Sequence, residues 1–306
     1  MPSQVMVDQE VFSRPYPHHP PASLSVLSNN VFLLGAVPWE QKTRAELIAK
    51  AEYIKHHDVV VLQECFRNEF CEDLKQSLRS GYPHATPSIG DSKEGWLSTS
   101  GKFNKLSPEN GGVAILSKWP ITKMRQFIYM DGCGWDKFSN KGVAYAELDI
   151  HGTKVHVFGT HMQSDDSLCH GGQAAQIRAQ ALDDFYYFVL AQQIPKSELV
   201  VMVGDFNIDR DSFEYREVLR RLRVVRPTFF KGAQWSYDTK QNGIARDRDP
   251  TAPSQNLDHI LVSTQHRMPR SVVETTLLVH STPYTHGSGT FNEFSDHYPV
   301  HAVIDL

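Results

Sequence analysis

The sequence predicts an α/β fold: a four-layer α/β sandwich in which two packed, mostly antiparallel β-sheets are flanked by helices. Short apolar runs typical of buried strands alternate with segments that have the apolar spacing of amphipathic helices. The strand-like segments form two runs with helical segments outside them, which favours two sheets packed together and covered by helices. The chain has neither a G-x-G-x-x-G nor a Walker sequence, so an open doubly wound sheet is the weaker alternative.

The first elements follow a proline-rich lead-in. Residues 24–34 predict a strand, and residues 43–46 (Thr-Arg-Ala-Glu) form a capping box that predicts a helix ending near His57. Residues 58–64 (Asp-Val-Val-Val-Leu-Gln-Glu) are apolar and β-branched, which predicts a fully buried strand. A second helix is expected from about Asn68.

The middle of the chain predicts a β meander, and helices and strands alternate again after it. Residues 81–110 are rich in Gly, Ser, Pro and Lys and predict a long irregular excursion. Residues 149–152 (Asp-Ile-His-Gly) predict a hairpin turn, and residues 172–193 carry an apolar stripe at helical spacing. The other expected elements are strands at 112–118, 142–150, 154–161, 198–205, 256–263 and 298–304, and a helix at 211–223.

Length and composition fit a single globular unit. The chain has 306 residues without a visible repeat or interdomain linker, so residues 24–306 are expected to form one domain after a lead-in at 1–23. No stretch approaches the roughly 20 apolar residues of a membrane helix, so a soluble protein is expected. The lead-in lacks the apolar core of a signal peptide, so the protein is either cytoplasmic or has already lost its signal.

Charge argues against a nucleic acid partner. The formal net charge is -4, so the chain lacks the overall basic field that steers proteins to nucleic acid phosphates. The arginine-rich segment 216–226 is a candidate basic patch, but the solvated face of a helix explains it about as well.

Cysteine content leaves the redox compartment open. Four cysteines permit two disulfides, and free buried thiols remain an alternative. No two of them form a C-x-x-C pair, so a structural zinc site is disfavoured.

Acidic and amide side chains recur where predicted strands end. Glu64 and Asp205 each end an apolar run, Asn207 follows Asp205, Asp258 begins another run, and Asp296 precedes the last. Each residue alone could cap a turn. Ionised carboxylates are costly to bury without a cation or hydrogen-bonding partner, so their recurrence predicts a site for a hard cation. Magnesium suits oxygen ligands and phosphate substrates best.

Two histidines, His161 and His297, occupy similar strand-end places. One neutral imidazole can take a proton from water while a second stabilises or protonates the leaving oxygen, as phosphodiester hydrolysis requires. The chain has no G-x-S-x-G elbow, which disfavours a serine hydrolase, and no H-E-x-x-H, which disfavours a zinc protease. His259 is expected to be structural, because it points to the opposite face of its strand from Asp258.

These motifs resemble those of the endonuclease/exonuclease/phosphatase superfamily. Within it, about residues 24–306 are most similar to the secreted, bacterial-type neutral sphingomyelinases. The similarity is carried by residues 111–121 (GGVAILSKWPI), 139–142 (SNKG), 159–163 (GTHMQ) and 295–299 (SDHYP).

The resemblance implies a secreted, monomeric hydrolase that cleaves sphingomyelin at a membrane surface into ceramide and phosphocholine. It implies Mg²⁺ as cofactor, with Mn²⁺ or Co²⁺ as substitutes. A nuclease or other phosphoesterase on the same scaffold, or a noncatalytic membrane-binding module, remains the alternative.

The resemblance also implies a metal-binding group. Glu64 would be the main magnesium ligand, with Asn30 beside it and Asp296 completing the polar cluster. Asp205 and Asn207 would hold metal, water or phosphate.

The same resemblance assigns the proton transfers. His297 would be the general base, oriented by Asp258, and His161 would stabilise the transition state or assist the departing alkoxide.

Other implied contacts concern the substrate and the loops. Asn140 and Lys141 would contact phosphate or choline unless they only form a turn, and Phe66 would flank choline or merely pack.

Cys133 and Cys169 match a disulfide of secreted members, whereas Cys65 and Cys71 remain a local bridge or free thiols. Members that dock on membranes carry an aromatic hairpin, but residues 265–294 here offer only single aromatics, so strong bilayer insertion by this segment is not expected.

Overall fold

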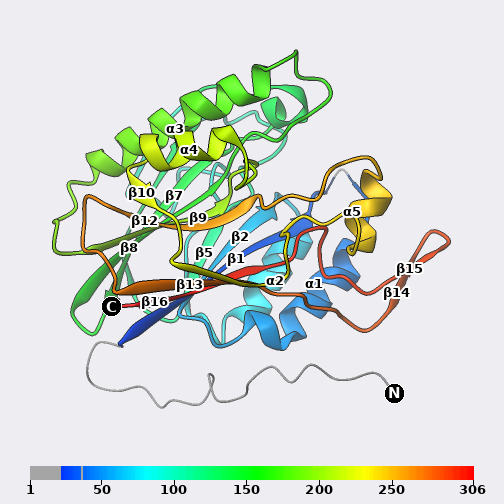
Figure 1. Ribbon diagram of the computed structural model, residues 1–306, viewed down its shortest axis with the longest axis horizontal. Coiled ribbons are helices and arrows are strands. Elements are labelled where there is room, and N and C mark those ends of the chain that lie inside the picture. Colours follow the sequence, from blue (N-terminus) through cyan, green and yellow to red (C-terminus); the bar gives the residue numbers. More distant parts are fainter. Residues whose placement is uncertain (1–21, 36) are drawn as a thin grey trace.

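The computed structural model describes residues 22–35 and 37–306. Most of the expected lead-in, residues 1–21, lies outside the described residues. Two seven-stranded sheets pack face to face, with α1 and α2 on one outer side and α3 and α4 on the other (Figure 1). Most neighbouring strands are antiparallel, and the predicted four-layer sandwich is confirmed.

The two sheets have the orders β11-β13-β16-β1-β2-β5-β3 and β10-β12-β9-β8-β7-β6-β4. The strands of the first sheet are β1 Ser23–Leu33, β2 Val59–Cys65, β3 His84–Ala85, β5 Ala114–Ser117, β11 Phe229–Gly232, β13 Ser271–Thr276 and β16 Val300–Asp305. Those of the second are β4 Ser98–Gly101, β6 Ile121–Ile128, β7 Gly142–Ile150, β8 Thr153–His161, β9 Leu199–Asp205, β10 Val224–Val225 and β12 Asp258–Ser263. A separate hairpin is formed by β14 Tyr284–His286 and β15 Gly289–Phe291.

Five α-helices and two short 3₁₀ helices connect these strands in the described part of the chain. They are α1 Gln41–Lys50, η2 Glu52–Ile54, α2 Glu69–Leu78, η3 Gly134–Phe138, α3 Gln173–Ala191, α4 Phe213–Arg221 and α5 Gly243–Arg248. None of the helices in the described residues is long and apolar enough to cross a membrane.

The continuous apolar runs arise because both faces of each sheet are covered. In β2, Val59 and Val61 face the core between the sheets, whereas Val60 and Leu62 face the cluster beneath α1 and α2. Successive strand residues point to opposite faces, so a strand buried on both sides loses the usual alternation of apolar and polar residues.

The predicted capping box at residues 43–46 is wrong. Helix α1 begins at Gln41, after Glu40 in a left-handed conformation, and Thr43 lies within its first turn. Gln41 organises this start instead, because its side chain accepts a hydrogen bond from Trp39 N and donates to Leu34 O. The helix also ends earlier than expected, at Lys50, and η2 fills most of the distance to His57.

Several short elements were not predicted from the sequence. The expected excursion at 81–110 contains β3 and β4, and the interval between the expected strands at 112–118 and 142–150 contains β6. In the last third, β10, β11, β13, the β14–β15 hairpin and α5 were not predicted. Most of these elements span six residues or fewer, too few to establish a period.

Candidate active site

Strand register brings three predicted residues together in the second sheet. Asp205, the last residue of β9, pairs with His161 at the end of parallel β8 and with Asp258 at the start of antiparallel β12. Gly204 permits this close pairing, since a Cβ at its φ of 150° would lie 2.0 Å from Thr160 O. The His161 Nε2 atom is 3.7 Å from Asp205 Oδ2.

Asn30 and Glu64 come from the first sheet, where parallel β1 and β2 end. Asn30 Nδ2 donates to Glu64 Oε1 at 3.0 Å and to Asp205 Oδ2 at 3.1 Å. The Asn30 amide therefore links carboxylates of the two sheets, and the site lies where the strand ends of both sheets meet.

His297 lies just before β16 and completes the group around Asp205. Its Nδ1 is 2.8 Å from Asp258 Oδ2, and its Nε2 is 3.8 Å from Asp205 Oδ2. Burial opposes a charge on the ring, but the charge and hydrogen bond of Asp258, followed by Asp205 and Asp296, raise the pKa of His297 to about 10. Asp258 thus fixes both the orientation of the ring and its affinity for a proton.

Asp296 is buried and forms an ion pair with Arg248 of α5. Burial alone would raise its pKa, but Arg248, His297 and Arg44 hold the pKa of Asp296 below its ordinary value. Glu64 shows the opposite balance: burial and the neighbouring Asp296 raise the pKa of this carboxyl. Arg248 was not predicted from the sequence, because no periodic or motif signal marks its short helix.

Asp205 has the most crowded surroundings of these carboxylates. Burial, and next the charge of Asp258, raise the pKa of Asp205 to about 7. Its Oδ1 accepts a hydrogen bond from Asn207 N at 2.8 Å, and Asn207 Nδ2 donates to Met162 O at 3.0 Å. Asn207 is therefore held beside the strand end that carries His161.

Lys141 approaches the same ring nitrogen of His161 that lies near Asp205. Its Nζ is 3.2 Å from His161 Nε2, donates to Met162 O at 3.0 Å and forms an ion pair of 2.8 Å with Asp136. Burial, Lys141 and His297 lower the pKa of His161 well below its ordinary value. A neutral ring that accepts from Lys141 at Nε2 carries its hydrogen on Nδ1, which has no hydrogen-bond partner among the described residues. Asp136 was not predicted from the sequence.

The two remaining predicted substrate contacts differ in position. The buried Phe66 ring has its centroid 6.3 Å from that of His161, so it borders the site. Asn140 Nδ2 instead donates to Gly90 O at 2.8 Å and Asn104 O at 2.9 Å, and its Oδ1 accepts from Asn104 N. The amide hydrogens of Asn140 are therefore used in hydrogen bonds that hold two loops together, whereas Lys141 belongs to the polar cluster.

The donor set fits a hard divalent cation. The potential ligand atoms of Glu64, His161 and Asp205 lie within 4.8 Å of one another, as do those of Asp205, Asp258 and His297. Asp205 is buried and Glu64 is partly buried, and the pKa of each is raised first by burial and then by a neighbouring carboxylate. A cation bound by oxygen ligands would relieve this repulsion.

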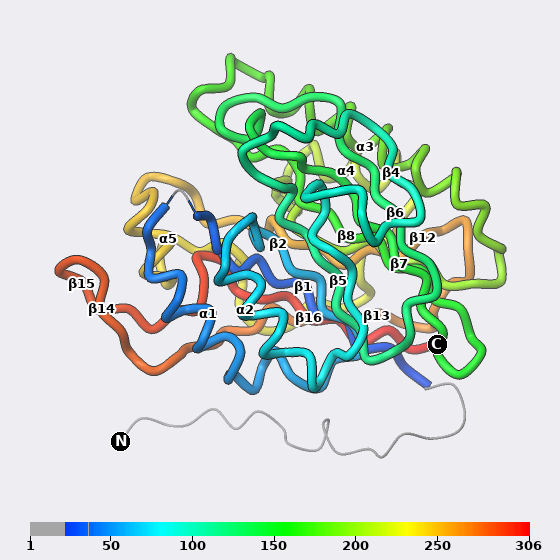
Figure 2. The backbone as a smooth tube through the Cα atoms, turned by 180° about the vertical axis from the view of Figure 1, so that it is seen from behind, coloured from blue at the N-terminus to red at the C-terminus, as the bar shows by residue number. Residues whose placement is uncertain are grey.

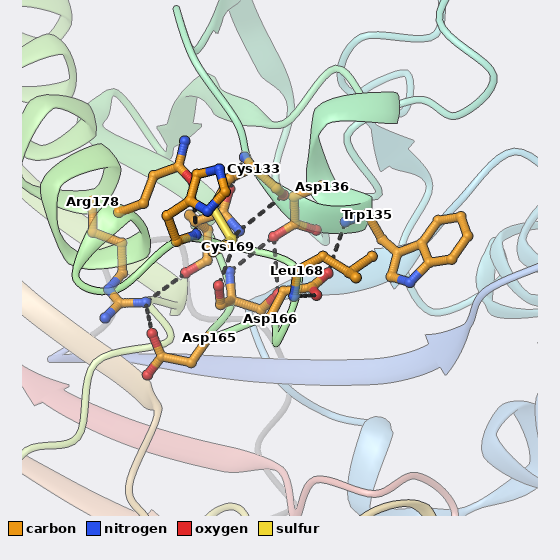
Figure 3. Close-up of a disulfide and its surroundings, with 12 residues drawn as sticks. Cys133, Trp135, Asp136, Asp165, Asp166, Leu168, Cys169 and Arg178 are labelled. Carbon is orange, nitrogen blue, oxygen red and sulfur yellow. Dashed lines mark hydrogen bonds and ion pairs between the residues drawn. A yellow bond between two sulfur atoms is a disulfide. The ribbon is translucent and has the colours of Figure 1, made fainter.

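Both pairs of cysteines form disulfides. The Cys133–Cys169 bridge expected from the resemblance is confirmed, and Cys65–Cys71, left open by the sequence, is also bridged. The first joins η3 to the segment after β8, close to Asp136 (Figure 3).

Known proteins resemble this chain over nearly all of its described length. The model of the Endonuclease/Exonuclease/phosphatase family matches residues 45–297. Sphingomyelinase C of Listeria ivanovii is 37% identical over 292 residues, which cover 93% of this chain and 87% of that protein. The crystal structure of sphingomyelinase C from Streptomyces griseocarneus has a TM-score of 0.89 at 42% identity, covering 92% of this chain and 99% of that one. A mutant of beta toxin from Staphylococcus aureus with bound magnesium ions has a TM-score of 0.89 at 36% identity, with coverage of 92% and 99%.

Proposed function

The chain belongs to the endonuclease/exonuclease/phosphatase family, and from this premise we propose that it is a magnesium-dependent phosphodiesterase that hydrolyses sphingomyelin to ceramide and phosphocholine. One geometric observation carries the proposal. Two imidazoles, His161 and His297, approach the same buried oxygen of Asp205, at 3.7 and 3.8 Å. This arrangement provides separate proton-handling groups on the two sides of one reaction centre.

Magnesium is the cofactor that the site and the relatives support. Glu64 would bind the ion with Asn30 and Asp205 or Asp296, and manganese or cobalt would serve as substitutes. The bound ion would polarise the phosphoryl oxygens and offset the carboxylate charge that raises the pKa of His297. A related structure holds magnesium ions, which agrees with this assignment.

His297 acts as the general base in this proposal. Its hydrogen bond to Asp258 fixes Nδ1, so Nε2 is the atom that takes a proton from the attacking water. The water oxygen forms a bond to phosphorus, the bond from phosphorus to the ceramide oxygen breaks, and the departing ceramide alkoxide takes a proton from solvent. Asp258 stabilises the resulting imidazolium.

The opposite side of the centre stabilises the charge that develops on phosphate and leaving oxygen. His161 and Lys141 lie there, 3.2 Å apart, and Asn207 is held next to them through Met162 O. The Lys141 ammonium supplies positive charge, and the His161 ring supplies a directional contact. Phe66 borders this side and would pack against the choline group.

The same proposal covers the organisation and location of the protein. We assign residues 24–306 to one catalytic domain, because β1 pairs with both β2 and the last strand, β16. We also propose a secreted monomer, since two disulfides suit an oxidising environment.

Phosphocholine release from sphingomyelin micelles tests the activity. We expect release with magnesium, none after EDTA, and recovery when magnesium is added back. His297→Ala should lower the rate by at least about 10³-fold, while its melting temperature stays near that of wild type.

Phosphatidylcholine and plasmid DNA, assayed in parallel, define the substrate class. DNA cleavage at low enzyme without phosphocholine release would replace the proposal with a nuclease on the same scaffold. A wild-type rate for His297→Ala would remove the assigned base.

A further inference from the structure

Four large apolar side chains are exposed beside the candidate active site. Trp135 and Phe138 belong to η3, where their ring centroids are 6.0 Å apart, and they are 72% and 43% exposed. Leu168 is 62% exposed, and its backbone N–H donates to the same Asp166 carboxylate as that of Trp135. These contacts place Trp135, Phe138 and Leu168 on one small area of surface.

Leu106 extends this area. It is 88% exposed, and the hydroxyl of the adjacent Ser107 donates to Phe138 O at 2.8 Å. Trp135, Phe138, Leu168 and Leu106 together are called the η3 surface below. Exposed apolar side chains that gather in this way indicate an interaction site, whereas single ones are ordinary.

The local covalent structure holds the η3 surface in place. The Cys133–Cys169 disulfide joins the residues directly before η3 to the turn that carries Leu168 (Figure 3). Gly134 has a φ of 55°, and a Cβ there would lie 2.2 Å from Asp166 Oδ2, so this tight approach requires glycine. In Figure 3 the Trp135 indole extends away from the disulfide rather than packing against it.

The η3 surface adjoins the candidate site through two side chains. Asp136, which follows Trp135, forms an ion pair with Lys141, and Lys141 lies 3.2 Å from His161. A cavity of about 180 Å³ lies in the same region, and its lining includes Met130, Asp136 and Lys141. A partner bound at Trp135 would therefore lie close to Lys141 and His161, which are expected to act on the phosphodiester.

The β14–β15 hairpin is the other projecting element at this end of the molecule (Figures 1 and 2). Its aromatic residues face inward: the Tyr284 hydroxyl donates to Glu293 O, and the Phe291 ring contacts that of Trp39, with centroids 4.6 Å apart. Its exposed positions include Thr285 and Ser288, and no large apolar side chain is exposed on either strand or at the turn. The hairpin therefore cannot supply the apolar contact that the η3 surface offers.

Charge around the η3 surface suits a membrane interface. The Lys137 ammonium lies 4.9 Å from the Phe138 ring centroid, and Lys105 is also exposed, whereas the exposed Lys102 forms an ion pair with Asp131. Aromatic and leucine side chains flanked by lysines are typical of segments that lie in the interface of a bilayer. We infer that the η3 surface docks the enzyme onto a lipid bilayer, so that the site beside it meets the headgroup of a membrane lipid. The inference rests on the proposed function, which makes the substrate a membrane lipid.

Vesicle binding by the magnesium-free protein tests the docking directly. The probe is a vesicle of sphingomyelin and phosphatidylcholine, sedimented in EDTA so that hydrolysis does not intervene. Trp135→Ser/Leu168→Ser should weaken binding at least tenfold, and its melting temperature should remain near that of wild type. The matched control, Tyr187→Ser/Leu190→Ser, removes exposed apolar side chains from α3 and should change binding less than twofold.

Hydrolysis separates docking from chemistry. The Trp135→Ser/Leu168→Ser variant should lose most of its rate on vesicles and keep the wild-type rate on a water-soluble, short-chain sphingomyelin. Vesicle binding equal to wild type would overturn the inference and leave the proposed function standing. Conversely, wild type that binds vesicles through this surface but releases no phosphocholine from either substrate would refute the proposed function alone.

A second copy of this chain is the competing occupant of the η3 surface. Sedimentation velocity of wild type and variant distinguishes it. A dimer that becomes a monomer in the variant, with unchanged vesicle binding, would assign the surface to self-association and overturn docking.

Discussion

Asp205 shows how a single residue can set the character of the site. Its Oδ2 accepts a hydrogen bond from Asn30 and also lies within 4 Å of a ring nitrogen of His161 and of His297. The groups around each imidazole give the two rings different affinities for a proton. Burial and Lys141 disfavour a proton on His161, whereas Asp258 outweighs burial and favours one on His297, so the pKa values move in opposite directions. Environments that separate the pKa values of similar groups are typical of acid–base sites.

Asp258 is expected to act through His297. Asp258→Asn removes the charge that raises the pKa of His297 and weakens the hold on its ring. We expect kcat to fall about 10²-fold, and the rising limb of the pH–rate profile to move to lower pH, because His297 then loses its proton more readily. The profile is measured on soluble substrate at saturating magnesium.

A control for this substitution is Asp249→Asn, which changes an exposed aspartate near Arg248. It should leave both kcat and the position of the limb unchanged. A kcat loss in Asp258→Asn without movement of the limb would mean that Asp258 is only structural.

At the level of elements, two short helices between the strands complete the site. Arg248 of α5 neutralises Asp296, and Asp136 of η3 holds Lys141 beside His161. The strand ends supply the reactive groups, and these short helices supply their ionic partners. The disulfides secure two of the loops involved, Cys65–Cys71 directly after Glu64 and Cys133–Cys169 at η3.

The two disulfides should differ in their contribution to stability. Cys133–Cys169 spans 36 residues and Cys65–Cys71 spans 6. The longer closed loop restricts the unfolded chain more, so Cys133→Ser/Cys169→Ser should lower the free energy of unfolding by about 3–4 kcal/mol and Cys65→Ser/Cys71→Ser by about 2 kcal/mol. Urea unfolding of both variants checks the order. Equal losses would contradict an effect that depends on loop length.

At the scale of the whole molecule, a second cluster of largely buried histidines lies away from the candidate active site. Far from the site, near the start of β1, Ser25 Oγ lies 3.0 Å from both His57 Nδ1 and His301 Nε2. Burial lowers the pKa of His57 to about 3 and that of His301 to about 4. Both rings therefore stay neutral in the folded protein.

This neutral pair predicts acid sensitivity. The unfolded chain protonates these histidines below about pH 6.5, whereas the folded chain does not until about pH 4, so the unfolded state binds more protons in between. Their stabilising contribution is present above about pH 6.5 and declines as the pH falls. Between pH 6.5 and 5 we expect the two histidines to account for a loss of about 3 kcal/mol in the free energy of unfolding.

Urea unfolding across this pH range measures the effect. His301→Asn should reduce the pH slope of the unfolding free energy relative to wild type, whatever its effect on absolute stability. Parallel slopes for the two proteins would contradict the assignment to this pair.

The sequence by itself determined the sandwich architecture and the residue types of the site. Strands such as β2 and β9 are apolar on both faces, and long helices such as α3 show one periodic stripe, because burial constrains both faces of these strands and one face of these helices. Each of Glu64, Asp205 and His161 alone could have a structural role, and they were found because carboxylates and imidazoles recur at the ends of several buried strands.

Only the tertiary structure decided how these groups meet. The pairing of Arg248 with Asp296, the position of Asp136 and the use of the Asn140 amide in loop packing depend on residues far apart in the chain. The same holds for the inward-facing aromatics of β14–β15 and for the exposed η3 surface. Local sequence encodes burial and backbone preference, but contacts between distant segments are fixed only when two sheets and their loops pack together.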